Sequence, residues 1–209
     1  MASLLYLKAS PRTERSHSIA VADEFVSEYR KTAPSDNVLT LDIFSELLPV
    51  FDGLAVEAKY LIMHGKVHTP QHAAAWKPVE ELITQFKTAD KYLLAVPMWN
   101  FSIPYRLKQY IDLIVQPGYT FSFDPEAGYQ GLVKDKPMLI IYARGGEYSA
   151  PEMQNLDLQK KYLELVFGFI GFEKIKSIIV EPTLHGGPDT AGQKKGEAID
   201  KAKELAKDF

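Results

Sequence analysis

The sequence contains no cysteine, and this absence excludes disulfides, thiolate metal ligands, cysteine nucleophiles and iron–sulfur clusters together. Long apolar runs are missing as well, since none approaches the roughly 18 residues of a membrane span. The apolar stretch at the start of the chain lacks the basic region and the cleavage site of a signal peptide. We therefore expect a cytoplasmic protein.

A large excess of charge of one sign is also missing. The 209 residues include 24 Lys and Arg and 27 Asp and Glu, which gives a formal net charge of −3. A nucleic-acid-binding protein needs a basic stripe to neutralise phosphates, so we expect no nucleic-acid partner. Hydrophobic residues make up 46% of the chain, enough for a packed core. No linker or repeat interrupts the sequence, and we expect one domain over residues 1–209.

Five short apolar runs alternate with segments of helical periodicity. The runs are residues 4–7, 38–41, 92–96, 138–142 and 175–180. Helices are expected at residues 52–63, 104–115, 155–170 and 189–209. Another is expected after a cap at Ser16 or Ser18, with apolar residues from Ile19 to Tyr29 on one face, and another starts at Thr69-Pro70 and carries Val79 to Phe86. Residues 119–133 look like an excursion or a hairpin. Continuous apolar strands that alternate with helices are typical of a parallel sheet covered on both faces. The pattern predicts an α/β fold with one doubly wound, five-stranded parallel sheet.

Ligands of such sheets bind at the carboxyl ends of the strands, so the loops after strands one, three and four should carry the function. The first loop, from Ser10 to Ser18, holds three serines, His17 and two arginines where a strand meets a helix N-terminus. Free N–H groups there favour an anion, and without a dinucleotide or NTPase glycine motif a phosphate monoester suits the loop best. Alternatively, Ser16 and Ser18 only cap the helix.

The second loop, from Pro97 to Pro104, combines Trp99 and Phe101 with Met98 and Asn100 directly after a buried strand. A planar heteroaromatic ring could lie against this wall, with the amide of Asn100 bonding its polar edge. Alternatively, the two aromatic residues belong to the core.

The third loop follows Ala143 with Arg144, Gly145 and Gly146. Two glycines allow the backbone to approach a ligand closely, although the same pair also suits a plain turn. The histidines at 64, 68 and 72 are separated by helix-breaking Gly65 and Pro70, so we expect no metal site. No nucleophile or catalytic carboxylate pair is evident either, which favours chemistry carried by a bound cofactor.

With these three loops in order, the sequence resembles the FMN-dependent NADH-azoreductases, a flavodoxin-like family of quinone and azo-dye reductases. The resemblance runs nearly end to end. It is strongest at residues 97–113, followed by residues 118–121, 131–133, 143–146 and 168–172. It implies a flavodoxin-like fold with strand order 2-1-3-4-5 and a homodimer with each flavin near the subunit interface.

The resemblance also implies site residues. Ser10, Ser16, His17 and Ser18 would hold the FMN phosphate. The remaining cofactor-binding residues would be Pro97, Met98, Trp99, Asn100 and Phe101 around the isoalloxazine, and Ala143, Arg144, Gly145 and Gly146 at its pyrimidine edge. The chain departs from the family's common residues at His17, Trp99 and Ala143, where Gln, Tyr and Ser are frequent.

The implied activity is reduction of quinones and azo compounds by two-electron hydride transfer from NADH or NADPH through bound FMN, in a ping-pong sequence. No side chain is assigned as a catalytic acid or base, and the N–H groups of Gly145 and Gly146 would stabilise charge on the reduced flavin. Phe121, Phe123 and Phe169 are expected to form an apolar wall for the substrate, or else to lie in the core or the dimer interface. Arg12, Arg15 and Arg106 are the basic residues that could read the 2′-phosphate of NADPH.

Three other functions remain open from the sequence. One is a flavodoxin-type electron carrier without its own substrate, although such carriers are usually more acidic. The second is a structural or regulatory protein that no longer binds flavin. The third is a phosphoester hydrolase at the serine-rich loop, which the missing nucleophile and metal ligands disfavour.

Overall fold

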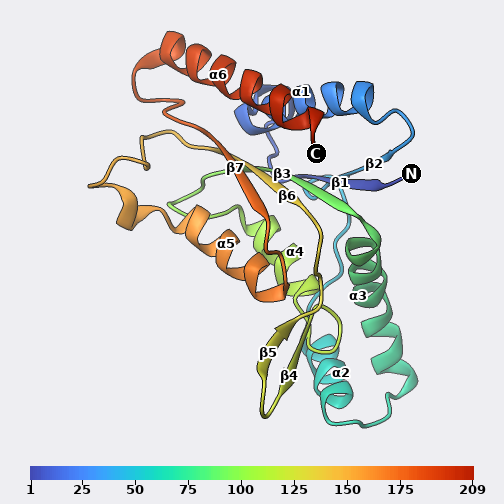
Figure 1. Cartoon of the computed structure of the whole chain (residues 1–209). Helices are drawn as coiled ribbons and strands as arrows, with labels where there is room; N and C mark the ends of the chain where they lie inside the picture. Colours follow the sequence, from blue (N-terminus) through green and yellow to red (C-terminus); the bar gives the residue numbers. More distant parts are fainter.

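Strands and helices alternate along the chain in the computed structural model, which describes all residues, 1–209 (Figure 1). The main strands are β1 (Ser3–Lys8), β2 (Asn37–Asp42), β3 (Lys91–Pro97), β6 (Met138–Ala143) and β7 (Ile175–Val180). The helices are α1 (His17–Thr32), α2 (Gly53–Met63), α3 (Pro70–Thr88), α4 (Tyr105–Ile114), α5 (Leu158–Ile170) and α6 (Gly187–Lys207). A hairpin consists of β4 (Phe121–Asp124) and β5 (Gly128–Gly131), and short 3₁₀ turns cover Thr13–Arg15 and Gln154–Leu156.

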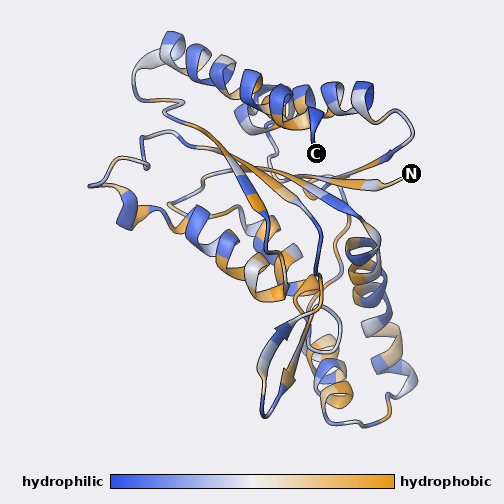
Figure 2. Cartoon of the chain, viewed as in Figure 1, coloured by the Kyte–Doolittle hydropathy of each residue, from blue (hydrophilic) through white to orange (hydrophobic).

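The main sheet has the order β2-β1-β3-β6-β7, and every neighbouring pair is parallel. The predicted flavodoxin-like order 2-1-3-4-5 is confirmed, because β6 and β7 are the fourth and fifth strands of this sheet. One expectation needs correction: β2 is an edge strand with Leu39 and Thr40 exposed, so it is not covered on both faces. The inner strands carry the continuous apolar runs, as the hydropathy colours show (Figure 2).

Two helical layers cover the sheet, with α1 and α6 on one face and α3, α4 and α5 on the other (Figure 1). Successive side chains of a strand point to opposite faces, so β3 supplies both cores. Leu93 and Ala95 pack with α1 and α6. Tyr92 and Leu94 pack with the helices of the other layer. None of the helices combines the length and the hydropathy that crossing a membrane would require.

Helices α1, α2, α3 and α5 each begin after a residue whose side chain caps them. The predicted start at Thr69 is confirmed, since its side chain accepts the N–H of His72 and the His72 ring accepts the N–H of Thr69. Helix α5 begins at Leu158, three residues later than expected, because a 3₁₀ turn precedes it and Asp157 caps it. Helix α6 begins at Gly187, two residues earlier than expected.

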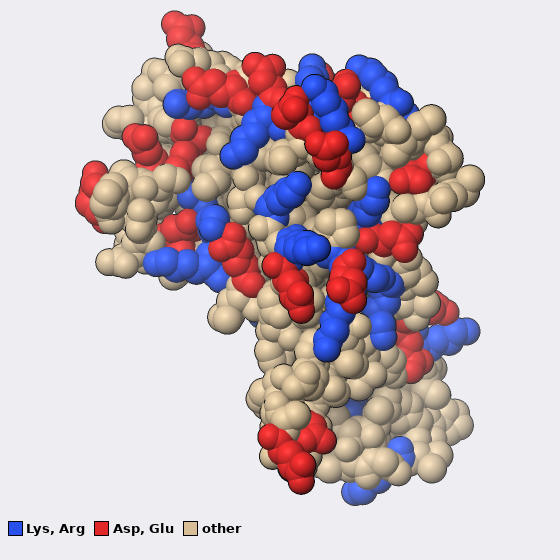
Figure 3. Space-filling model, viewed as in Figure 1, with Lys and Arg blue, Asp and Glu red and all other residues tan.

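The segment at 119–133 forms the expected hairpin, which projects with α2 from one end of the molecule (Figure 1). Gly131 lies so close to the end of α5 that a Cβ atom on it would overlap the backbone of Gly171. The structure therefore requires glycine at position 131, and this close approach anchors the hairpin to α5. Charged side chains are frequent over α1 and α6 and sparser around the hairpin and α2 in the view of Figure 3.

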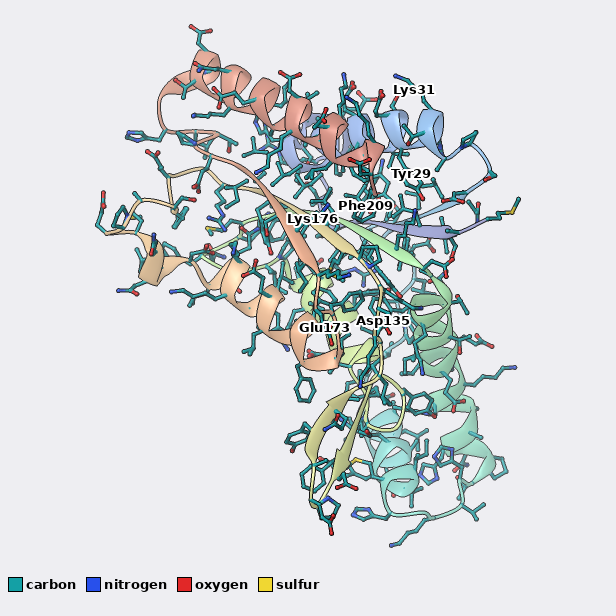
Figure 4. The ribbon with its side chains drawn as sticks, viewed as in Figure 1. Tyr29, Lys31, Asp135, Glu173, Lys176 and Phe209 are labelled. Atoms are coloured by element: carbon teal, nitrogen blue, oxygen red, sulfur yellow. The ribbon has the colours of Figure 1, made fainter.

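The end of the chain returns to the first helix. The ring of Phe209 packs edge-on against Phe25, with centroids 5.2 Å apart, and lies 6.4 Å from the ring of Tyr29 (Figure 4). Helices α1 and α6 thus cover their face of the sheet as one packed pair.

Candidate functional site

The three candidate loops meet at one edge of the sheet because β1, β3 and β6 are adjacent and parallel. Main-chain bonds join the strand ends, from the Ala9 N–H to the Ala95 carbonyl over 3.0 Å and from the Met98 N–H to the Ala143 carbonyl over 2.8 Å. The predicted residues of all three loops therefore lie side by side at the carboxyl ends of these strands.

The serine loop carries polar groups with few partners inside the protein. Ser10, Ser16 and Ser18 are all buried. The Oγ atoms of Ser16 and Ser18 lie 3.2 Å apart, so one hydroxyl donates to the other and the second keeps a free proton. The Ser10 hydroxyl only accepts, from the N–H of Arg12 at 3.4 Å. Buried hydroxyls normally find acceptors, so these spare donors indicate a ligand that accepts hydrogen bonds.

The backbone beside the serines has the same property. Ser16 caps α1 by accepting the N–H of Ile19 at 3.5 Å, and this cap does not use the proton of its hydroxyl. The N–H groups of His17 and Ser18, in the first turn, have no acceptor in the structure. Free N–H groups at a helix N-terminus favour a phosphate. The loop therefore offers donors that fit a phosphate group, among them the free main-chain N–H of His17.

The second loop contains a tight, strained turn. Trp99 and Ser102 exchange two main-chain hydrogen bonds, of 3.0 and 2.9 Å. The two residues between them have positive φ angles, 48° at Asn100 and 67° at Phe101. Asparagine tolerates the left-handed region, but for phenylalanine it is unfavourable, and such strain concentrates at functional sites. The turn presents the side chains of Asn100 and Phe101 to solvent.

The aromatic residues of this loop are not core residues. Phe101 is 46% exposed, and its ring meets that of Tyr148 with centroids 6.2 Å apart. Trp99 is half-buried and forms a three-ring cluster with Phe44 and Tyr105, with centroids between 5.7 and 6.3 Å apart. Trp99 and Asn100 also line an open cavity of about 750 Å³ over α4. The core alternative for Trp99 and Phe101 is therefore wrong.

The third loop offers unpaired backbone donors. The N–H groups of Gly145 and Gly146 have no acceptor, while the carbonyl of Gly145 accepts from Leu184 and His185. A Cβ atom on Gly145 would lie 2.9 Å from the Leu184 side chain, so this position is tightly packed. The two free donors can bond a polar ring edge or an oxyanion.

Arg144 lies behind this loop and holds it in place. Its side chain is only 1% exposed and makes three contacts. Its Nη2 donates to Asp157 over 2.8 Å, Nη1 to Glu181 over 3.3 Å and Nε to Gln159 over 3.1 Å. All three of these hydrogen bonds of the guanidinium are to groups of the protein itself. Cofactor binding by Arg144 stays a prediction.

The partners of Arg144 connect the second and third loops. The carboxylate of Glu181 also accepts the N–H groups of Tyr148 and Ser149, both at 2.9 Å. The amide of Gln159 donates to the carbonyl of Val96, at the end of β3, over 3.1 Å. The arginine network therefore fixes the turn and the glycine loop relative to each other.

The predicted substrate wall forms a separate aromatic cluster. Phe121, Phe123 and Phe169 surround Tyr129, with ring centroids between 4.8 and 6.1 Å apart. They line a cavity of about 600 Å³ together with Lys59, Tyr60 and Met63 from α2 and with Pro117. Phe123 and Tyr129 are more than 60% exposed, so they are not core residues.

Sequence reasoning missed Lys59, the basic residue of this aromatic cavity. Its side chain is half-buried, and desolvation lowers the pKa of its ammonium group below the ordinary value, against a weaker opposing effect of Asp112. No local motif marks Lys59, because only the folding of α2 against the hairpin brings it to the cavity. Arg106, by contrast, donates to the carbonyls of Ile43 and Glu46, in the segment that follows β2.

Comparison with known proteins gives one consistent family. A protein family described as having a flavodoxin-like fold matches residues 2–206. The FMN-dependent NADH:quinone oxidoreductase of Nitratidesulfovibrio vulgaris (strain DP4) is 54% identical over 210 residues, covering 100% of both chains. The enzyme of the same name from Desulfotalea psychrophila is 48% identical and covers 98% of both.

A solved structure agrees with these relatives. The FMN-dependent NADH-azoreductase of Bacillus anthracis, in complex with FMN, has a TM-score of 0.86 and 27% sequence identity to this chain. The similarity covers 99% of this chain and 100% of that one. The whole fold, including all three loops of the sheet edge, lies within these matches.

Proposed function

Because the chain belongs to the flavodoxin-like family that includes the FMN-dependent NADH:quinone oxidoreductases, we propose that it reduces quinones and azo compounds with NADH through bound FMN. The serine loop is the observation that carries this proposal. Its buried hydroxyls keep spare donors beside the free N–H groups of His17 and Ser18, as a phosphate site requires.

The other two loops suit the remainder of the cofactor. Met98, Trp99, Asn100 and Phe101 would flank the isoalloxazine, and Gly145 and Gly146 would donate N–H groups to its pyrimidine edge. Bound FMN would supply hydride acceptance and donation between NADH and the oxidant. The chain's own residues would hold and orient the ring, and the two glycine N–H groups would stabilise negative charge at that edge. No side chain is required as an acid or base, since water can protonate the product.

Four further features belong to this proposal. We infer a homodimer with the flavin near the interface, because Phe101, Tyr105 and Leu158 expose large apolar side chains around the proposed ring site. Phe121, Phe123 and Phe169 would form the apolar wall of the substrate site.

NADH as the donor is consistent with a cytoplasmic location. Residues 1–209 would act as one domain, since helices α1 and α6 share one core.

The test is a visible absorption spectrum of the purified protein, followed by anaerobic addition of NADH and then of a quinone. A yellow protein that bleaches with NADH and regains its colour with the quinone is the expected result. A yellow protein that neither NADH nor NADPH bleaches would contradict the enzyme and favour an electron carrier. A protein that stays colourless after FMN is supplied would contradict flavin binding.

Matched variants make the test specific to the serine loop. Ser10→Ala removes a buried hydroxyl with a spare donor, and we expect weaker FMN binding by about tenfold, the effect of losing one hydrogen bond to a charged group. Ser45→Ala removes an exposed serine whose hydroxyl donates to Asp42 away from the loop, and should leave FMN binding unchanged.

A further inference from the structure

A second cavity lies beside the serine loop, and residues of α6 line it. Figure 1 shows α6 on the same face of the sheet as α1. It has a volume of about 350 Å³ and lies between the loop after β1 and the start of α6. Arg12 and His17 line it from the loop, and Pro188, Ala191, Gly192 and Lys195 line it from α6. None of Ser10, Ser16 and Ser18 lines it, and His17 is the residue that the cavity shares with the donors of the serine loop.

The charges around the cavity are all of one sign. Arg12, His17 and Lys195 line it, and no carboxylate does. Neither Arg12 nor Lys195 has an acidic partner within ion-pair distance, whereas Lys194 on the same helix pairs with Glu197 at 3.3 Å. Arg12 and Lys195 carry like charges without counter-charge and repel one another, and an anion between them would remove that repulsion.

His17 provides an independent sign of a missing partner. Its Nδ1 atom is buried and makes no hydrogen bond in the structure. Burial lowers the pKa of this imidazole, and the neighbouring Lys195 and Arg12 lower it further. A buried ring nitrogen without a partner is costly unless a ligand supplies one.

The start of α6 completes the cavity. The helix begins after Gly186 without a side-chain cap. The Gly187 N–H donates to the Leu184 carbonyl and Pro188 has no N–H, so the N–H groups of Asp189 and Thr190 are the ones that lack an acceptor. Pro188, Ala191, Gly192 and Lys195 follow one another at the spacing of a single helix face. The small residues at 191 and 192 leave room between the helix and His17, and Lys195 closes the far end.

We propose that this cavity binds the phosphate group of a small anionic ligand, separately from a flavin phosphate held by the serines. Arg12 and Lys195 neutralise the two charges of a phosphate monoester. The ring of His17 donates a hydrogen bond from its Nδ1–H to one of the phosphate oxygens. The ligand is either free phosphate or the phosphate of a nucleotide such as the 2′-phosphate of NADPH. The site does not depend on the proposed reductase activity.

The experiment is a calorimetric titration of the FMN-loaded protein with inorganic phosphate, using chloride salts to keep ionic strength constant. We expect one phosphate per chain, and binding about tenfold weaker in Lys195→Gln, since a charged hydrogen bond contributes a factor of that order. Lys194→Gln is the matched control, because this neighbouring lysine already pairs with Glu197 and does not line the cavity. It should bind phosphate like the wild type.

Three results would overturn the proposal: no binding at millimolar phosphate, equal binding by the two lysine variants, or release of FMN by phosphate, which would make the two sites one. Should the protein prove unable to bind FMN, the titration still decides, since the comparison of Lys195→Gln with Lys194→Gln needs no flavin. The ratio of the KM values for NADH and NADPH identifies the source of the bound phosphate group. A preference for NADPH that Lys195→Gln removes indicates the 2′-phosphate, and phosphate binding without such a preference indicates free phosphate.

Discussion

The Nη2 atom of Arg144 lies 2.8 Å from the Oδ2 atom of Asp157, and both side chains are buried behind the candidate flavin loops. Glu181 approaches the same guanidinium at 3.3 Å. One cation thus faces two carboxylates where water is largely excluded. Such a cluster is hard to replace piece by piece, because each removal leaves a buried charge without compensation.

Arg144→Met should therefore lower the free energy of unfolding by about 3–5 kcal/mol, as expected for breaking a buried pair. Arg144→Lys retains the charge but cannot reach Asp157, Glu181 and Gln159 together. Its free energy of unfolding should lie between those of Arg144→Met and the wild type. Urea unfolding measures both. Lys160→Met, which breaks the half-exposed pair with Glu164, is the control and should lose less than about 1 kcal/mol. Equal losses in Arg144→Met and Lys160→Met would contradict the role of the network.

The turn at Asn100 and Phe101 predicts an unusual order of stabilities. Phe101→Gly relieves the strain of a φ of 67°, whereas Phe101→Ala removes the same ring and retains the strain. The glycine variant should therefore be more stable than the alanine variant by about 1 kcal/mol. Thermal or urea unfolding decides the order. Both variants should bind FMN more weakly than the wild type, because both lose the ring.

The serines allow capping to be separated from phosphate binding. Ser16→Ala should lower stability by about 1 kcal/mol and weaken FMN binding, since Ser16 caps α1 and belongs to the serine cluster. Ser18→Ala should weaken FMN binding with little loss of stability. Asp52→Ala, at the cap of α2, should lower stability alone. Fluorescence titration of FMN and urea unfolding give the two readouts, and FMN binding unaffected in both serine variants would contradict the phosphate site.

The lowered pKa of His17 predicts a pH dependence of stability in the flavin-free protein. An unfolded histidine has a pKa of about 6.5, and the folded His17 binds its proton less readily because of burial, Lys195 and Arg12. Stability is therefore retained above pH 6.5 and falls as the pH drops below it. Urea unfolding at pH 7.5 and 5.5 should show a smaller fall in His17→Gln than in the wild type. His64→Gln, at an exposed histidine, should fall as the wild type does.

The aromatic cavity predicts a selective kinetic effect. Phe123 is 63% exposed, so Phe123→Ala should change the unfolding free energy by less than about 0.5 kcal/mol. If the ring contacts substrate, kcat/KM for a large apolar quinone should fall roughly tenfold, the effect of losing a buried aromatic contact. Leu165→Ala, at an exposed leucine of α5, should leave the kinetics unchanged. Unaltered kinetics of Phe123→Ala with several quinones would remove Phe123 from the substrate wall.

Local patterns in the sequence were sufficient for the five strands, the helix cap at Thr69 and the three loops at their carboxyl ends, whereas the strand order came from the family resemblance. The strands, the cap and the loops depend on apolar runs and on residues close together in the chain, and both can be read directly from the sequence. The partners of Arg144 were not predictable, because Glu181 lies 37 residues away and carries no motif. The left-handed conformation of Phe101 was not predictable either, since phenylalanine disfavours it and only the surrounding loop imposes it.

The packing of α6 onto α1 has a consequence for how the protein is synthesised. Every strand of the sheet has emerged from the ribosome before α6, yet the face that carries Leu93 and Ala95 needs both helices for its cover. The nascent chain therefore presents a half-covered apolar sheet until the last 21-residue helix is released. Chaperone contacts during translation should accordingly concentrate on this face. A chain whose translation stops before residue 187 should be prone to aggregation.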